Sequence, residues 1–430
     1  MRLSLSLVDS GATVSAGLLV NLLLARWLPA LHYGAFALVF ALFLFLAGLH
    51  NALVLEPMSV NGPANHPRNL ADYFEAQIWV HLAFTAVLAA PLLLAAALLA
   101  LSGYGGPLPG ALLGAGLAFP FVLLLWLARR MCRILARPVS AISASACSLV
   151  LLLCGLLALQ VTRKTTPFLV FLLFGFASLC TALLIFHKLQ IGLDETRPCS
   201  VSWRSAAAEN WRYGRWLLGG EVCVASLSQT PMLLVPVFLG LAAAGEFRAL
   251  QIPALLMLKC SAAGAMFLLP SFARESLNGS RCLRQLAHRA SLGLAGASLL
   301  FAALLCFIAA PVERLLFGGK FASDAWLIPV FVIIPVSAAF ASGYSMALRA
   351  MKRPNFDRLA NGIAAAVSVQ GAFLFIPLWG LAGAAISLAS GFVVHAAVVC
   401  LCFRNAAANE RKEFASQSAE EITPLEQFNI

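Results

Sequence analysis

The sequence predicts an all-α polytopic membrane protein that crosses the bilayer about twelve times. Of its 430 residues, 61% are hydrophobic and only 11% are charged, whereas about a quarter of the residues in a soluble domain are charged. The apolar residues lie in long runs, and a helix needs roughly 20 apolar residues to cross the hydrocarbon core. The positive charges collect at one end of these runs. The chain therefore has room for about twelve spans and for no large soluble domain.

Apolar runs bounded by charged residues or by Pro and Gly give the expected spans. They lie at residues 8–28, 33–55, 77–101, 109–128, 139–161, 167–187, 216–240, 248–271, 290–311, 325–348, 359–378 and 380–403. The first run follows only one basic residue and lacks a convincing small-residue cleavage site. We therefore expect a retained span there rather than a signal peptide.

The cationic residues are divided unequally between the two ends of these spans. With the N-terminus placed in the cytoplasm, 22 of the 29 Lys and Arg residues fall on the cytoplasmic side. The outer side holds only Arg26, Arg163, Lys164, Arg248, Arg314 and Lys320. Because loops rich in Lys and Arg stay in the cytoplasm, both termini are expected there. A nucleic-acid partner is not expected, because the charges occupy short loops and form no single basic face.

Two pairs of tracts repeat at an offset close to half the chain length. Arg133-x-x-x-Arg137-Pro138 and Arg349-x-x-x-Arg353-Pro354 are 216 residues apart, and Gly34-x-Phe36 and Gly245-x-Phe247 are 211 residues apart. Together they predict two six-helix lobes. Since six is even, both lobes enter the membrane from the same side and are related by an axis along its normal, around a central cleft.

The expected organisation is an N-terminal lobe over 1–187, a cytoplasmic inter-lobe linker over 188–215, a C-terminal lobe over 216–403 and a disordered cytoplasmic tail over 404–430. The tail is polar and is expected to lack a core. The linker region carries three Trp among three Arg, ending at Trp216. This mixture is typical of an interfacial amphipathic helix on an anionic leaflet, and an ordinary basic loop fits it equally well.

Ionisable side chains inside a span are costly, so each is a candidate functional residue. Lys259 lies about eleven residues into the run 248–271, near the bilayer midplane, and that run contains no acid. It is expected either to contact an anionic substrate group or to pair with a carboxylate of another helix. Glu221 is a candidate for that partner or for a protonatable coupling site. Asp9 opens the first run and is expected to be structural, because an acid there favours the helix dipole.

Four further residues are candidates for the lining of the cleft. Arg26 and Arg248 lie at the outer ends of their runs, where long cationic side chains usually extend to the interface, and both are candidates for the mouth of the cleft. Asn21 and Gln251 add polarity inside their runs. They are candidates for hydrogen bonds between helices or to sugar hydroxyls.

Sequence motifs for enzyme chemistry are missing. The chain has no H-E-x-x-H, no phosphate-binding loop motif, no acidic cluster for a divalent ion and no long outer loop. Most cysteines lie inside apolar runs, where Cys behaves as a small hydrophobe, and the C-x-C at Cys400 and Cys402 has no second pair at zinc-site spacing. We therefore expect no enzyme activity, no cofactor and no metal site.

Several short tracts appear in an order that is typical of one transporter family. Ala25-Arg-Trp-Leu-Pro and Tyr33-Gly-Ala-Phe36 resemble its first helix and turn. The other tracts run from Asn51 to Met58, Gly245 to Gln251, Leu268 to Pro270, Leu316 to Phe321 and Pro377 to Ala385. Together they resemble the polysaccharide exporters of the multidrug/oligosaccharidyl-lipid/polysaccharide superfamily, the Wzx-type repeat-unit flippases.

The resemblance implies a MATE-like flippase fold and a function. The protein would flip an undecaprenyl-diphosphate-linked oligosaccharide repeat unit across the bacterial inner membrane by alternating access, for exopolysaccharide or O-antigen synthesis. Its partners would be this substrate, membrane lipids, and the polysaccharide polymerase and export machinery. The alternative is a cation-coupled multidrug antiporter of the same fold, with Glu221 as the coupling acid. A membrane enzyme of polysaccharide assembly fits less well.

Overall fold

The computed structural model describes residues 17–191, 201–275, 280–353 and 355–422. Within these ranges the chain is helical, with no β-strand. After a short apolar helix at Gly17–Trp27, the elements are α2 Ala30–His50, the π-helix η1 Asn51–Leu55, α3 Glu56–Asn65, α4 Leu70–Leu101, α5 Leu108–Ile134, α6 Pro138–Val161, α7 Pro167–Leu189, α8 Trp203–Leu239, α9 Leu241–Glu275, α10 Ser280–Phe317, the 3₁₀ helix η2 Ala322–Leu327, α11 Ile328–Ala350 and α12 Asn355–Ile422.

Within the described residues, the expected membrane spans correspond to helices. Ten stretches of the described chain are long and apolar enough to cross a membrane. The 54-residue stretch Asn355–Ala408 holds two expected spans, because Gly380 (φ 58°, ψ −134°) reverses the chain inside α12. Gly371 then faces Ser387, so the two halves of α12 pack antiparallel. With the Gly17–Trp27 helix in the second half of the first run, the predicted all-α membrane fold is confirmed.

The two R-x-x-x-R-P tracts form the same turn. Ala136 and Lys352, at equivalent positions, both adopt the left-handed conformation, with φ of 53° and 57°. The N–H groups of Arg137 and Arg353 each donate to the carbonyl five residues earlier, at 2.9 Å. This closure satisfies carbonyls at a helix end and redirects the chain into the next helix. The sequence repeat therefore marks a structural repeat.

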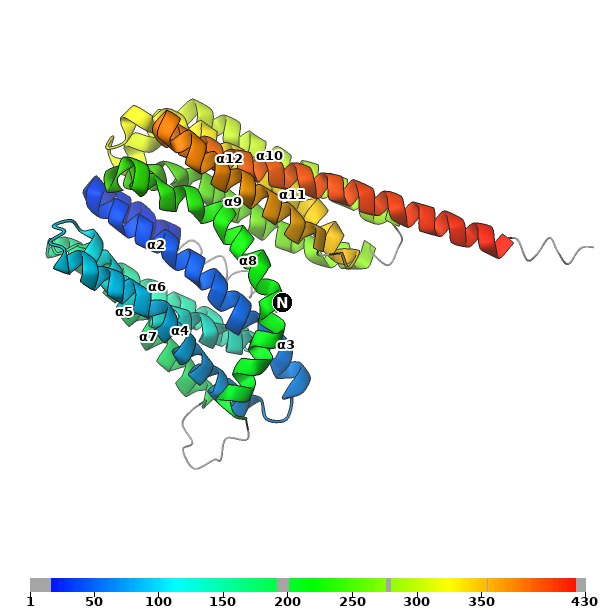
Figure 1. Cartoon of the computed structure of the whole chain (residues 1–430), viewed down its shortest axis with the longest axis horizontal. Helices are drawn as coiled ribbons and strands as arrows, with labels where there is room; N and C mark the ends of the chain where they lie inside the picture. The colour runs from blue at the N-terminus through cyan, green and yellow to red at the C-terminus, as the bar shows by residue number, and fades with distance from the viewer. Residues whose placement is uncertain (1–16, 192–200, 276–279, 354, 423–430) are drawn as a thin grey trace, which may run out of the picture.

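The helices form two lobes that share a core at only one end. Figure 1 shows α4 to α7 grouped on one side and α9 to α12 on the other, with α2 and α8 between them. At the predicted outer end, one apolar cluster includes residues of both lobes, for example Phe36, Phe171, Phe247 and Phe331. Toward the predicted inner end each lobe has its own cluster. The lobes are thus joined at the predicted outer end. The lobe boundaries and the side of each terminus remain predictions.

Two glycines make the closest approach between the lobes. A Cβ on Gly34 of α2 would overlap the carbonyl oxygen of Leu241 at the start of α9. A Cβ on Gly245 would lie 2.6 Å from the carbonyl oxygen of Ala30. No side chain can occupy either position in this arrangement. These glycines belong to the second sequence repeat, which therefore forms the contact between the lobes.

Helical structure extends into part of the predicted linker and part of the predicted tail. α8 begins at Trp203, so residues 203–215 of the predicted linker are helical and continue into the next span. α12 ends at Ile422, so residues 404–422 of the predicted tail are helical. Ala, Glu, Lys and Arg favour helix, and extending an existing helix avoids the cost of nucleation, so no apolar core is needed. Residues 423–430 lie outside the described residues.

The predicted topology can be checked by labelling single cysteines introduced into a cysteine-free background. Gly105, in the exposed α4–α5 turn, should react with a membrane-impermeant reagent added to intact cells. Arg133→Cys and Ser205→Cys, both exposed at the other end of the bundle, should react only after the cells are opened. Labelling of Arg133→Cys in intact cells would overturn the predicted orientation.

Candidate functional site

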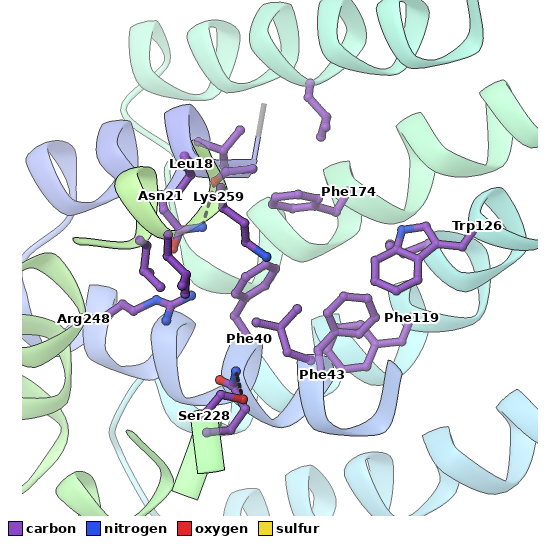
Figure 2. Close-up of a pocket in the computed structure, with 18 of the residues that line it drawn as sticks. Leu18, Asn21, Phe40, Phe43, Phe119, Trp126, Phe174, Ser228, Arg248 and Lys259 are labelled. Atoms are coloured by element: carbon purple, nitrogen blue, oxygen red, sulfur yellow. Dashed lines mark hydrogen bonds between the residues drawn. The ribbon is translucent and has the colours of Figure 1, made fainter. Parts of the chain in front are cut away.

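A cavity of about 610 Å³ lies between the lobes. It is lined by the Gly17–Trp27 helix, by α2, α5, α6 and α7 of the first lobe, and by α8 and α9 of the second lobe, with one residue from α11 and two from α12. Figure 2 shows its labelled side chains converging from several helices. The cavity thus occupies the expected position of the central cleft.

One face of α9 supplies three of the predicted site residues. Arg248, Gln251 and Lys259 all line the cavity, at spacings that place them on one side of a helix. The side chain of Lys259 is exposed although it lies in the middle of α9, because it projects into the cavity, towards Phe40 and Phe174 in Figure 2. No ion pair or hydrogen bond of Lys259 is found in the described part of the chain.

Arg248 lies on the part of the cavity wall that is nearer the predicted outer end, where the two lobes are joined. Only 7% of it is exposed. Its guanidinium donates to Gln251 Oε1 at 3.1 Å, and its buried Nε has no hydrogen-bond partner. Among the described residues no acid pairs with Arg248. A buried guanidinium without a carboxylate is costly, and an anion entering the cavity would offset that cost.

Asn21 lines the cavity from the Gly17–Trp27 helix and lies beside Lys259 in Figure 2. Its Nδ2 donates to the carbonyl oxygen of Gly17 at 2.9 Å. Its Oδ1 is buried and has no partner. Gln229 of α8 likewise has a buried Oε1 without a partner. Both amides therefore offer unused acceptors to a hydroxyl group of a ligand.

Aromatic side chains of the first lobe form the opposite wall of the cavity. This aromatic wall consists of Phe40, Phe43, Phe119, Trp126, Phe171 and Phe174. The rings of Phe43 and Phe119 lie 4.3 Å apart between centroids, and Phe119 meets Phe171 edge to face at 5.8 Å. Packed in this way, the rings form a rigid apolar surface. Sequence inspection did not single out these residues, because phenylalanine is frequent throughout the chain.

A third cation lies on the cavity wall towards the predicted inner end. Arg129 of α5 was assigned to the cytoplasmic side from the sequence, but it is 93% buried within the helix and lines the cavity. Ser145, Ser148 and Ser178 line the same region. The sequence signal was present as an arginine pair, Arg129-Arg130, at the end of an apolar run, but the sequence did not indicate that Arg129 lines the cavity.

Acidic residues are missing from the described lining of the cavity. Its charged members are Arg129, Arg248 and Lys259, and no Asp or Glu occurs among the described residues that line it. Because the charged side chains of this described lining are all cations, the lining favours anions over cations.

Glu221 does not line the described cavity. Glu221 Oε1 accepts a hydrogen bond from Asn51 Nδ2 at 3.1 Å. Asn51 in turn accepts from Arg130 at 3.1 Å, and Arg130 pairs with Glu56 at 3.0 Å. Glu221 therefore belongs to a polar chain between α8 and the first lobe, and its partner is Asn51 rather than Lys259. Asp9 lies outside the described residues.

Arg26 holds the two lobes together at the predicted outer end. Its guanidinium donates to the carbonyl oxygen of Leu315 in α10 at 3.1 Å. From the loop after α10, the Lys320 ammonium donates to the carbonyl oxygens of Arg26 and, at 3.2 Å, Leu28. Partial burial and, to a smaller extent, the nearby charge of Arg26 lower the pKa of Lys320. Arg26 does not line the described cavity.

No protein-family model and no curated protein sequence matches this chain. Solved structures do resemble it. A multidrug resistance MATE family transporter of the MOP superfamily, in an inward-facing conformation, gives a TM-score of 0.75 at 16% identity and covers 96% of each chain. The lipid II flippase MurJ, in an inward closed conformation, gives 0.74 at 13% identity over 92% of this chain and 87% of that chain. An outward-facing MATE transporter gives 0.65 at 16% identity over 95% of this chain and 96% of that chain.

The chain therefore has the fold of MATE transporters and of MurJ, as the resemblance predicted. At these identities the likeness shows the fold alone. Of the three conformations compared, the two inward ones have the higher TM-scores. The arrangement of the lobes is thus more similar to these two than to the outward-facing one.

Proposed function

We propose that this protein is a flippase for an anionic lipid-linked oligosaccharide, namely an undecaprenyl-diphosphate-linked repeat unit, in the bacterial inner membrane. The observation that carries the proposal is the charge of the cavity, which has three cations and no acid among its described lining residues. A diphosphate would be attracted by Lys259 and Arg248, because hydrogen bonds between ions are stronger than those between neutral groups.

The opposite wall of the cavity suits the sugar part of such a substrate. Sugar rings have apolar faces that pack on aromatic side chains, and the aromatic wall supplies them from the first lobe. The unused acceptors of Asn21 and Gln229 would bind hydroxyl groups. The lipid tail would stay in the bilayer. In this proposal the structure corresponds to an inward-facing state, which the likeness to two inward conformations supports.

A multidrug antiporter of the same fold is the second candidate, since MATE transporters share the architecture. A cationic drug would need an acidic partner in the cavity, because burying an unpaired charge is costly. Glu221 is the acid that the sequence offered, but it bonds to Asn51 and does not line the described cavity. The charge distribution therefore favours the anionic substrate.

Deletion of the gene tests the proposal directly. We expect the deletion strain to accumulate a polyprenyl-diphosphate-linked oligosaccharide that stays accessible only from the cytoplasm, and to lose the corresponding surface polysaccharide. Its sensitivity to cationic drugs should stay unchanged. Increased drug sensitivity without accumulation of the lipid-linked oligosaccharide would instead support the antiporter. Co-purification of a polysaccharide polymerase or export component would test the proposed partners.

A further inference from the structure

The first turns of α8 have a buried face and an exposed face. Ala206, Asn210 and Gly214 recur at every fourth residue and are buried, so they form one stripe along the helix. The opposite face carries Arg204, Trp211, Arg212, Arg215 and Trp216, all exposed. We call these five residues the basic face of α8.

The buried stripe fixes this part of α8 to the first lobe. Asn210 and Gln77 of α4 exchange two amide hydrogen bonds, of 3.1 and 2.8 Å. A Cβ on Gly214 would lie 2.6 Å from the carbonyl oxygen of Ala52. Alongside, Glu209 pairs with His66 at 3.2 Å. The basic face therefore cannot turn inward, and its orientation is fixed by packing on the first lobe.

The basic face combines large aromatic rings with positive charge. Trp211 is 56% exposed and Trp216 is 67% exposed. The guanidinium of Arg215 lies 5.2 Å from the centroid of the Trp216 ring. The nearest acid along the helix, Glu209, is engaged by His66. Indole rings prefer the interface between water and hydrocarbon, and arginine binds phosphate groups.

The position of the basic face indicates what covers it. α8 continues without interruption from Trp216 into an apolar span, so the basic face lies at the level where the helix enters the bilayer. Figure 1 shows this part of α8 crossing beside α3 at the end of the first lobe. The lipid headgroups at that level are therefore its immediate neighbours. Acidic headgroups complement its three arginines, whereas zwitterionic headgroups do so less well.

We propose that the basic face of α8 binds the acidic headgroups of the cytoplasmic leaflet. Arg204, Arg212 and Arg215 contact the phosphates, and Trp211 and Trp216 insert at the boundary of the acyl chains. This lipid site is separate from the transport cavity, because none of its residues lines that cavity. Since the segment is packed on the first lobe and continues as the first span of the second, bound lipid fixes the first lobe relative to the membrane surface.

The test uses the purified full-length protein in nanodiscs made of phosphatidylcholine with or without phosphatidylglycerol. Dibrominated phosphatidylglycerol should quench tryptophan fluorescence more than dibrominated phosphatidylcholine. Trp211→Phe combined with Trp216→Phe should remove this difference. Each arginine near an anionic surface contributes roughly a fivefold gain in affinity. The triple variant Arg204→Gln, Arg212→Gln, Arg215→Gln should therefore retain at least about tenfold less phosphatidylglycerol in native mass spectrometry.

The matched control removes the same charge at the other end of the bundle, by Arg163→Gln, Lys164→Gln and Arg314→Gln, all exposed. It should retain phosphatidylglycerol as the wild type does. An equal loss of phosphatidylglycerol in both triple variants would mean that only the net charge of the protein matters. That result would overturn the proposal. So would an absence of tryptophan quenching in the wild-type protein, a result that does not depend on whether any variant folds. Unchanged lipid binding by the arginine variant would show that these arginines do not hold the lipid and would also overturn the proposal.

Discussion

Replacement of Gly34 by alanine is expected to separate the two lobes at the predicted outer end. The added Cβ would overlap the carbonyl oxygen of Leu241, a main-chain atom that cannot rotate away. Overpacking of this kind costs about 1–3 kcal/mol or more, so the closed arrangement should lose roughly ten- to a hundredfold in population. A cysteine at Ile334, which lines the cavity, should then react with an impermeant reagent added outside, and export should fall at least tenfold.

The matched control is Gly296→Ala in α10, because a Cβ there meets no other atom within 4 Å. This variant should keep both normal export and the protection of the cysteine at Ile334. Gly245→Ala, with its Cβ 2.6 Å from the carbonyl oxygen of Ala30, should reproduce the effect of Gly34→Ala. Normal export together with full protection in Gly34→Ala would mean that this contact plays no part in the transport cycle.

Replacement of Lys259 by alanine is expected to leave a well-inserted protein that accumulates its lipid-linked substrate inside. A hydrogen bond to a charged group contributes about 1.5–3 kcal/mol, so export should fall roughly ten- to a hundredfold. Lys259→Arg should retain partial export, because the positive charge remains in the cavity. Lys188→Ala, which removes an exposed lysine outside the cavity, should export normally.

The double variant Glu221→Gln, Lys259→Gln separates substrate contact from structural pairing. If the two residues formed a pair, each single neutral substitution should reduce abundance and the double variant should recover it. Since Glu221 bonds to Asn51, we expect no recovery of export. Normal export by the double variant would rule out substrate contact by Lys259.

The fold could be predicted from the sequence because a bilayer imposes long apolar helices. The repeated tracts were informative for a further reason. The turn ending at Arg137 and its counterpart at Arg353 need a particular chain reversal, and Gly34 and Gly245 need the absence of a side chain. Such local requirements leave a sequence signature even where overall similarity between the halves is weak.

The cavity was only partly predictable. Lys259 and Arg248 stood out as charges in apolar runs. Arg129 was assigned to a cytoplasmic helix end and not to the cavity, and Phe119 and Phe171 looked like any other apolar residue of a span. Which face of a helix looks into a cavity depends on packing between helices distant in the sequence, and in a membrane protein the lipid-facing side is equally apolar, so periodicity carries little information.

The contact at Gly34 and Gly245 brings main chain against main chain, so nothing within it ionises and no side chain adapts. Salt screens charges, and protons act on titratable groups; neither acts on packing of this kind. This glycine contact should therefore have the same strength across a wide range of pH and ionic strength. Any response of the transport cycle to the medium must then arise in the charged parts, such as the cavity cations or the contacts of Arg26 and Lys320.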